Sequence, residues 1–139
     1  MFANGSVGTF ETSRNIVGPQ SQMAFDIHGT KGAISWNLET MNEMKIFLTD
    51  ETYTHDGYTT VYAGDRFPYH GSFVPGDANA IGYEDLKVIE CLQFLNAIAD
   101  EKQHKPGFRE AVNYVSVQQA LADSWESRSW QKVVDISLH

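Results

Sequence analysis

The chain of 139 residues is poor in two features that define whole classes of protein, namely cysteine and long apolar runs. Its single cysteine, Cys91, excludes a disulfide framework within the chain, and because it lies among apolar residues we interpret it as a small buried hydrophobe. No apolar run approaches the length of a membrane-spanning helix, and the first residues lack the charged and apolar regions of a signal peptide. The sequence therefore predicts a cytoplasmic protein with no membrane partner.

Basic side chains are also scarce. The 10 lysines and arginines stand against 18 aspartates and glutamates, which gives a net charge of −8 without any basic cluster. Because nucleic acids and anionic membranes are recognised mainly through positive charge, this balance argues against both as partners. The five histidines form no pair at helix spacing, so the sequence predicts no metal site. The length is sufficient for one domain with a hydrophobic core.

Motifs for catalysis and for dinucleotide binding are missing as well. The chain has no G-x-G-x-x-G, and its segments Gly5–Gly8 and Gly29–Gly32 lie among expected strands with no helix directly after them. No serine lies in the glycine pattern of a nucleophile elbow. The acidic residues Glu39, Asp50 and Glu51 are interpreted as solvated turn residues rather than as an acid pair. The sequence thus predicts no catalytic, cofactor-binding or metal-binding residue in this chain.

The front half of the chain predicts a meander of strands. Apolar and polar residues alternate in three successive segments, which is the pattern of half-buried strands. Gly29 and Gly32 favour a tight connection between the first two of them, since glycine adopts positive φ without steric cost. One strand is expected before these segments, and a weaker one rich in Thr and Tyr after them. The expected strands cover residues 6–14, 23–28, 33–39, 43–48 and 53–63.

The back half predicts two helices after a long loop. The loop, Gly64–Asn79, holds prolines, glycines and aromatic residues without periodicity, and such loops are often functional. Apolar residues then recur at helical spacing in Tyr83–Asp100 and in Arg109–Arg128, with a break at Lys105–Gly107 between them. A closing strand is expected at Lys132–Leu138. This order indicates an α+β fold, an open-faced and mainly antiparallel β-sheet with two helices packed on one face.

The sheet face turned away from the helices is mixed in character. Alternation places His28, Ser35, Lys45 and Phe47 on it. An antiparallel sheet can leave one face in water, but a wide open face is also a suitable surface for a partner. Both interpretations stay open, and the mixed polar and aromatic character leads us to expect a homodimer through this face.

Several short motifs occur in an order and spacing that resemble one family of oxidoreductases. They are Phe2-x-Asn4-Gly5-x-x-Gly8-Thr9-x-x-x-Ser13-Arg14, Phe25-Asp26-Ile27-x-Gly29-Thr30-Lys31-Gly32, Ile81-Gly82-Tyr83-Glu84, Phe94-Leu95-x-Ala97-Ile98 and Ser124-x-Glu126-Ser127-x-x-Trp130. Together they cover nearly the whole chain, which resembles the C-terminal domain of the glucose-fructose oxidoreductase / inositol dehydrogenase / MocA family. The fold implied by this resemblance is an α/β domain of the type also found in dihydrodipicolinate reductase and glyceraldehyde-phosphate dehydrogenase.

The resemblance implies a role in an NAD(P)-dependent enzyme that acts on sugars or polyols. In that family a Rossmann domain in the N-terminal half binds NAD or NADP, and the catalytic lysine, aspartate and histidine lie upstream of the part matched here. Residues 1–139 are therefore expected to be a single C-terminal domain, a fragment that frames the substrate and mediates oligomerisation without catalysis of its own. The alternative is a stand-alone small α+β ligand-binding or protein-interaction module without redox chemistry.

Five residues are candidates for contact with the sugar or polyol substrate. Arg14, at an expected strand end, can donate paired hydrogen bonds to hydroxyls or a carboxylate, and Asn15 can donate and accept. Tyr83 and Lys87 lie four residues apart and share a helix face, where they either border the pocket or pack as a ring on a lysine stem. His70 can partner a sugar hydroxyl. The structural alternatives are a surface cation for Arg14 and an exposed loop histidine for His70.

Overall fold

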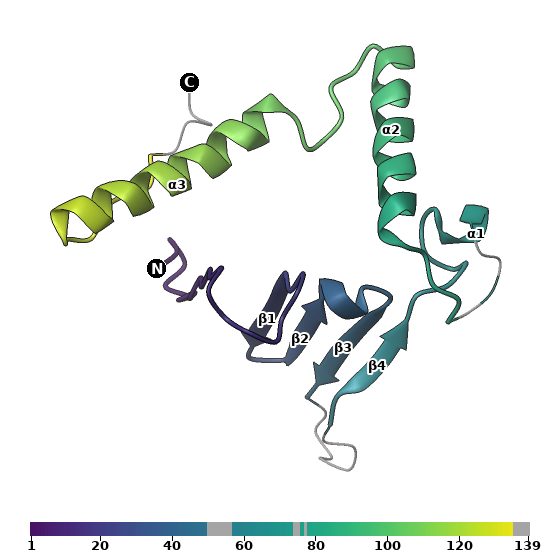
Figure 1. Ribbon diagram of the computed structural model, residues 1–139, viewed down its shortest axis with the longest axis horizontal. Helices are drawn as coiled ribbons and strands as arrows, with labels where there is room; N and C mark the ends of the chain where they lie inside the picture. Colours follow the sequence, from purple (N-terminus) through teal and green to yellow (C-terminus); the bar gives the residue numbers. More distant parts are fainter. Residues whose placement is uncertain (50–56, 74–75, 77, 135–139) are drawn as a thin grey trace. The chain divides into compact units, whose positions relative to one another are not determined.

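The computed structural model describes residues 1–49, 57–73, 76 and 78–134. The chain divides into two compact units, Met1–Ile81 and Gly82–His139. The first unit contains the sheet and the second contains the two long helices (Figure 1).

The first unit is built on a four-stranded antiparallel sheet in the order β1-β2-β3-β4 (Figure 1). The strands are β1 (Ala24–Gly29), β2 (Gly32–Asn37), β3 (Glu43–Leu48) and β4 (Thr59–Tyr62). A short 3₁₀ helix, η1 (Leu38–Thr40), follows β2. Each strand pairs with the next one in the sequence, so the predicted meander is confirmed. The part of the predicted weak strand at residues 53–56 lies outside the described residues.

The strand register places the alternating apolar residues opposite one another. Phe25 pairs with Trp36 and Ile27 with Ile34, and Ile34 in turn pairs with Ile46 on β3. The rings of Phe25 and Trp36 are 5.7 Å apart between centroids, a cross-strand contact of the kind that stabilises antiparallel pairs. Because directly paired residues point to the same side, these residues form one apolar face of the sheet. The alternation read from the sequence is therefore confirmed.

The segment before β1 differs from the prediction. Residues 6–14 were expected to form a strand, but they pair with no strand among the described residues and have no regular secondary structure. Val7 and Phe10 are 77% and 83% exposed. Local bonds dominate instead: Asn4 Oδ1 accepts hydrogen bonds from the backbone N–H and the hydroxyl of Ser6. A segment with strand-like composition becomes a strand only where an adjacent strand offers backbone hydrogen bonds. Residues 6–14 have no such neighbour in the described part of the chain, which explains the wrong prediction.

The second unit contains two long helices, α2 (Tyr83–Ala99) and α3 (Phe108–Ser127), close to the predicted ranges. Both begin with an acidic side chain that accepts a backbone hydrogen bond. Asp85 Oδ2 accepts from the N–H of Gly82 at 2.7 Å, and Glu110 accepts from the residue before α3. Such bonds satisfy amide groups that a helix start leaves without a partner. The helices are confirmed, and their starts are explained by acidic caps.

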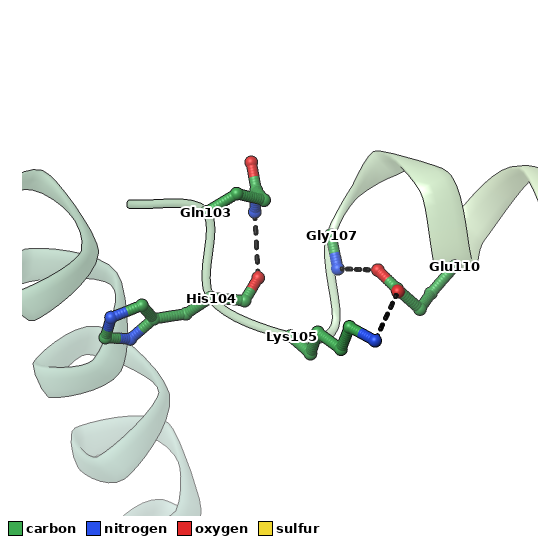
Figure 2. Close-up of polar contacts among 5 residues, drawn as sticks. All are labelled: Gln103, His104, Lys105, Gly107 and Glu110. Atoms are coloured by element: carbon green, nitrogen blue, oxygen red, sulfur yellow. Dashed lines mark hydrogen bonds and ion pairs between the residues drawn. The ribbon is translucent and has the colours of Figure 1, made fainter. Parts of the chain in front are cut away.

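The connection between α2 and α3 is organised by short polar contacts (Figure 2). The side-chain amide of Gln103 donates to the carbonyl of His104 at 2.9 Å. The Glu110 carboxylate accepts from the Gly107 N–H at 2.8 Å and lies 3.9 Å from the ammonium of Lys105. These contacts lower the pKa of Glu110, mainly through the backbone hydrogen bond from Gly107. The Glu110 carboxylate therefore links the connection between the two helices to the first turn of α3.

Three further predictions need correction or lie partly outside the described residues. The loop after β4 contains a short helix, α1 (His70–Phe73), which the absence of periodicity did not predict. Residues 132–134 have no strand conformation, and the rest of the predicted closing strand lies outside the described residues. Cys91 is exposed on α2 rather than buried. Helical periodicity places a residue on a face of its helix but does not show whether that face is covered.

Among the described residues, Ile81 is the one large apolar side chain that is buried, with 5% of its surface exposed. Its backbone is held by Asn42, which directly precedes β3. The side-chain amide of Asn42 donates to the Ile81 carbonyl at 2.9 Å, and its Oδ1 accepts from the Ile81 N–H at 3.0 Å. This side chain thus connects two points that are 39 residues apart.

Candidate functional site

Arg14 and Asn15 lie in a bend of the segment before β1, and both are exposed. The N–H of Asn15 donates to the hydroxyl of Ser13 at 3.3 Å, which shapes the bend locally. The guanidinium and the carboxamide thus belong to neighbouring exposed residues of a segment without regular structure. The sequence predicted that Arg14 lies at a strand end. This prediction is wrong, because no strand forms there in the described part of the chain.

The same segment is attached to the sheet by Glu39, which lies in η1. One carboxylate oxygen of Glu39 accepts hydrogen bonds from the backbone N–H groups of Gln20 at 2.7 Å and Ser21 at 2.9 Å. These bonds lower the pKa of Glu39, with the Ser21 bond as the larger cause. The side chain of Asn37 in turn accepts from the Glu39 N–H at 3.0 Å. Glu39 is an exposed residue of the connection between β2 and β3, as predicted, and it also binds the segment before β1, which the sequence did not predict; Asp50 and Glu51 lie outside the described residues.

His70 begins the short helix α1 in the loop after β4. Its Nδ1 lies 3.3 Å from the carbonyl oxygen of Pro68, and its ring is edge-on to Phe67 with 6.3 Å between centroids. The sequence predicted an exposed histidine or a substrate contact, and the structure shows a half-buried ring in an aromatic environment.

Tyr83 and Lys87 share one face of the first turns of α2, as their spacing predicted. The Lys87 ammonium lies 5.5 Å from the centroid of the Tyr83 ring, which is the geometry of a cation–π contact. It also forms an ion pair with Glu90 at 2.9 Å. The Glu90 side chain raises the pKa of Lys87, so the amine stays protonated and acts as a donor. The pair forms an exposed aromatic and cationic patch.

The polar face of the sheet contains a shallow depression of about 350 Å³ at the end of the β1–β2 hairpin. His28, Ala33, Phe47 and Tyr58 are among the residues that line it. The rings of Phe47 and Tyr58 meet edge to face at 5.9 Å. This face is therefore partly aromatic, as the alternation of the strands predicted.

Within each unit the structure brings some candidates together and adds others. Arg14 and Asn15 are chain neighbours, and Tyr83 contacts Lys87. Residues that the sequence did not single out are Arg66 and Phe67, and Glu39 was predicted only as a solvated turn residue. The aromatic content of the loop was the one available signal for Phe67, whereas no sequence signal pointed to Glu39.

Neither a metal-binding cluster nor a membrane-spanning helix occurs among the described residues. No group of three or more histidine, cysteine, aspartate or glutamate side chains in this part of the chain has an arrangement that could hold a metal ion. None of the helices formed by these residues combines the length and the apolar character needed to cross a bilayer.

The fold and the sequence together define a class of protein. A family model described as the C-terminal alpha/beta domain of an oxidoreductase family matches residues 1–133. The chain therefore belongs to the glucose-fructose oxidoreductase / inositol dehydrogenase / MocA family, and the resemblance inferred from the sequence is confirmed. The open antiparallel sheet with helices is that family's C-terminal fold.

Particular relatives include levoglucosan dehydrogenase of Pseudarthrobacter phenanthrenivorans, which is 35% identical over 136 residues, or 98% of this chain and 35% of the relative. A structure of levoglucosan dehydrogenase in complex with NADH and levoglucosan superposes with a TM-score of 0.91, covering 97% of this chain and 37% of the relative at 35% identity. An NAD binding oxidoreductase from Klebsiella pneumoniae gives 0.87 at 28% identity, covering 96% and 36%. The chain thus spans about a third of the length of these relatives.

Proposed function

We propose that this chain is the substrate-framing C-terminal domain of an NAD(P)-dependent sugar or polyol oxidoreductase. In this role, residues 1–139 form one functional domain that works with a dinucleotide-binding domain. The observation that carries the proposal is the family match over residues 1–133, supported by similarity to a dehydrogenase crystallised with NADH and levoglucosan. A structure of levoglucosan dehydrogenase in complex with NADH and L-sorbose also supports a polyhydroxylated substrate.

The division of labour follows from the residues that the chain provides. Hydride transfer requires a nicotinamide, and a dinucleotide site requires a glycine-rich turn at a helix start, which this sequence does not contain. The chain does provide hydrogen-bond donors suited to hydroxyl groups, at Arg14 and Asn15 in the first unit and, in the second unit, at Lys87 beside the ring of Tyr83. Such groups contribute to catalysis by fixing the orientation of the substrate.

The polar sheet face is proposed as a homodimer surface. Its support is the combination of Phe47 and Tyr58 with the polar side chains paired around them, Ser35 with Lys45 among them. Light scattering of the chain at high concentration is expected to give the mass of a dimer, and substitution of Phe47 by glutamate is expected to give the mass of a monomer. A monomer for the unsubstituted chain would contradict the dimer and leave the enzymatic proposal intact.

The enzymatic proposal is tested by a chimera. The N-terminal part of levoglucosan dehydrogenase is joined to this chain, whose fold superposes on the part that it replaces. The chimera is expected to reduce NAD⁺ with at least one sugar or polyol from a panel that includes levoglucosan, followed by NADH absorbance. The control is the same N-terminal part without any C-terminal domain, which is expected to bind NADH without turnover.

Two outcomes would count against the proposal. One is a folded chimera that binds NADH but oxidises no member of the panel, which would favour a binding module without redox chemistry. The other concerns the chain alone, for which we expect no NAD(H) binding. Nicotinamide fluorescence showing micromolar affinity for the isolated chain would contradict the division of labour.

A further inference from the structure

The loop between β4 and α2 closes on itself at its base. The N–H of Ala78 donates to the carbonyl of Ala63 at 3.0 Å, and the N–H of Ala63 donates to the carbonyl of Asn42 at 2.8 Å. Loops whose ends meet in this way are frequently functional. The base of the loop is thus fixed to the start of β3, so side chains on the loop are displayed from a rigid support.

Three side chains of this loop form a contact series. The guanidinium of Arg66 donates to the carbonyl of Tyr62 at 2.7 Å and lies 4.8 Å from the centroid of the Phe67 ring. The Phe67 ring in turn meets the His70 ring edge-on. Arg66 therefore supports the aromatic ring from β4, while 38% of the Phe67 surface stays exposed. An exposed aromatic ring with a guanidinium 4.8 Å from its centroid and an imidazole centred 6.3 Å away is a preorganised apolar platform.

The tautomer of His70 follows from its partner. The carbonyl of Pro68 can only accept a hydrogen bond, so Nδ1 of His70 carries the proton in this contact. In the neutral ring Nε2 is then the acceptor, which suits a hydroxyl donor.

The residue before His70 shows strain. Tyr69 has φ of 71°, in the left-handed region that a bulky side chain rarely adopts, and its side chain is 40% exposed. Strain of this kind at an exposed aromatic residue is typical of positions where the surrounding structure fixes a functional geometry. Tyr69 lies between Phe67 and His70 in the sequence, so this conformation falls within their contact.

From these contacts we infer that Phe67 and His70 form a specificity-determining contact for the sugar substrate, a role that rests on the proposed function. The apolar C–H face of a sugar ring packs on the exposed Phe67 ring, and a hydroxyl at the edge of the sugar donates to Nε2 of His70. The contact favours cyclic sugars, whose ring holds its C–H groups in a fixed arrangement, over linear polyols. Arg66 and Tyr69 act as positioning residues that hold the ring and the turn.

The test is a titration of the 139-residue chain with levoglucosan and with the linear polyol sorbitol, followed by NMR. Amide signals of residues 66–70 and the ring signals of Phe67 and His70 are expected to shift with levoglucosan and to shift less with sorbitol. The substitution Phe67→Leu is expected to weaken binding by about tenfold, since it removes the aromatic face. His70→Gln is expected to weaken it severalfold. The matched control is Phe10→Leu, an exposed phenylalanine of the same unit, which is expected to leave binding unchanged.

Three results would overturn the inference. Shifts confined to Tyr83 and Lys87 would place the sugar elsewhere and leave the proposed function standing. If no signal shifted, the proposed contact between the loop and the sugar would be refuted. The chimera described above would still test the proposed function separately. If the three variants, Phe67→Leu, His70→Gln and Phe10→Leu, bound levoglucosan equally well, Phe67 and His70 would contribute nothing to binding. Retained dispersion of the amide signals would show that the variants are folded.

Discussion

The two hydrogen bonds between Asn42 and the backbone of Ile81 provide the sharpest test of what holds the first unit together. Replacing Asn42 by alanine leaves the N–H and the carbonyl of a largely buried residue without their partners. A hydrogen bond contributes about 1 kcal/mol net, and an unsatisfied buried group costs about 1–3 kcal/mol. Because these bonds are only partly buried, water replaces them in part, and we expect a loss of about 1–3 kcal/mol in the free energy of unfolding.

Urea denaturation followed by Trp36 fluorescence measures this loss, in a background where Trp125 and Trp130 are replaced by phenylalanine. For a slope of about 2 kcal/mol per molar urea, a loss of about 2 kcal/mol lowers the midpoint by about 1 M. The matched variant Asn42→Asp keeps the acceptor for the Ile81 N–H but places a carboxylate oxygen against the Ile81 carbonyl. It is expected to be at least as unstable at neutral pH and to recover partly when acid protonates the carboxyl. An unchanged midpoint for Asn42→Ala would refute the reasoning.

Three further predictions concern the sheet and the two carboxylates with lowered pKa. Gly32→Ala is expected to destabilise the sheet by about 1–3 kcal/mol, because the added methyl group overlaps the carbonyl oxygen of Phe47. The control is Gly29→Ala, whose added methyl group meets its nearest neighbour at an ordinary 3.5 Å. Thermal unfolding of the two variants compares their stabilities. The lowered pKa of Glu39 means that its tether is fully present above the ordinary glutamate pKa and is lost as pH falls through the folded-state value; the protection of the amides before β1, measured as exchange relative to the intrinsic rate at each pH, is expected to fall with it, and Glu39→Gln to abolish this change in protection. The pKa of Glu110 is lowered in the same direction, so acid or Glu110→Gln is expected to lower the protection of the amides in the first turn of α3, and unchanged protection would contradict the role of its backbone bond.

Much of the fold was predictable because its elements have strong local signals. Strict alternation fixed β1, β2 and β3 to within a residue or two, and a helical repeat ending at a proline and glycine break fixed α2 and α3. The wrong predictions concern residues whose conformation or burial depends on parts of the chain that are distant in sequence. Residues 6–14 have the composition of a strand but no ladder, and Cys91 has apolar neighbours in sequence but an exposed place on its helix. A short stretch of sequence shows neither whether a segment finds a strand to pair with nor whether a helix face is buried.

The candidate site shows the same division. The shared face of Tyr83 and Lys87 followed from a spacing of four residues. The contact between Phe67 and His70 did not follow from periodicity, because it depends on a loop closed by backbone bonds. The two backbone bonds of Glu39 span 18 and 19 residues, and no motif encodes them.

The protonation states of the candidate residues bear on their roles under the proposed function. A catalytic base for alcohol oxidation must accept the hydroxyl proton as hydride leaves the carbon. Arg14 cannot accept a proton, because a guanidinium stays charged in proteins. Lys87 is held in its charged form by Glu90, which raises its pKa, so it is a donor as well. Each of these two donors can hold a hydroxyl of a polyhydroxylated ring, Arg14 from the first unit and Lys87 from the second, while under the proposed function the hydride goes to a nicotinamide held by the dinucleotide-binding domain. This set of side chains therefore favours a domain that selects and orients the substrate.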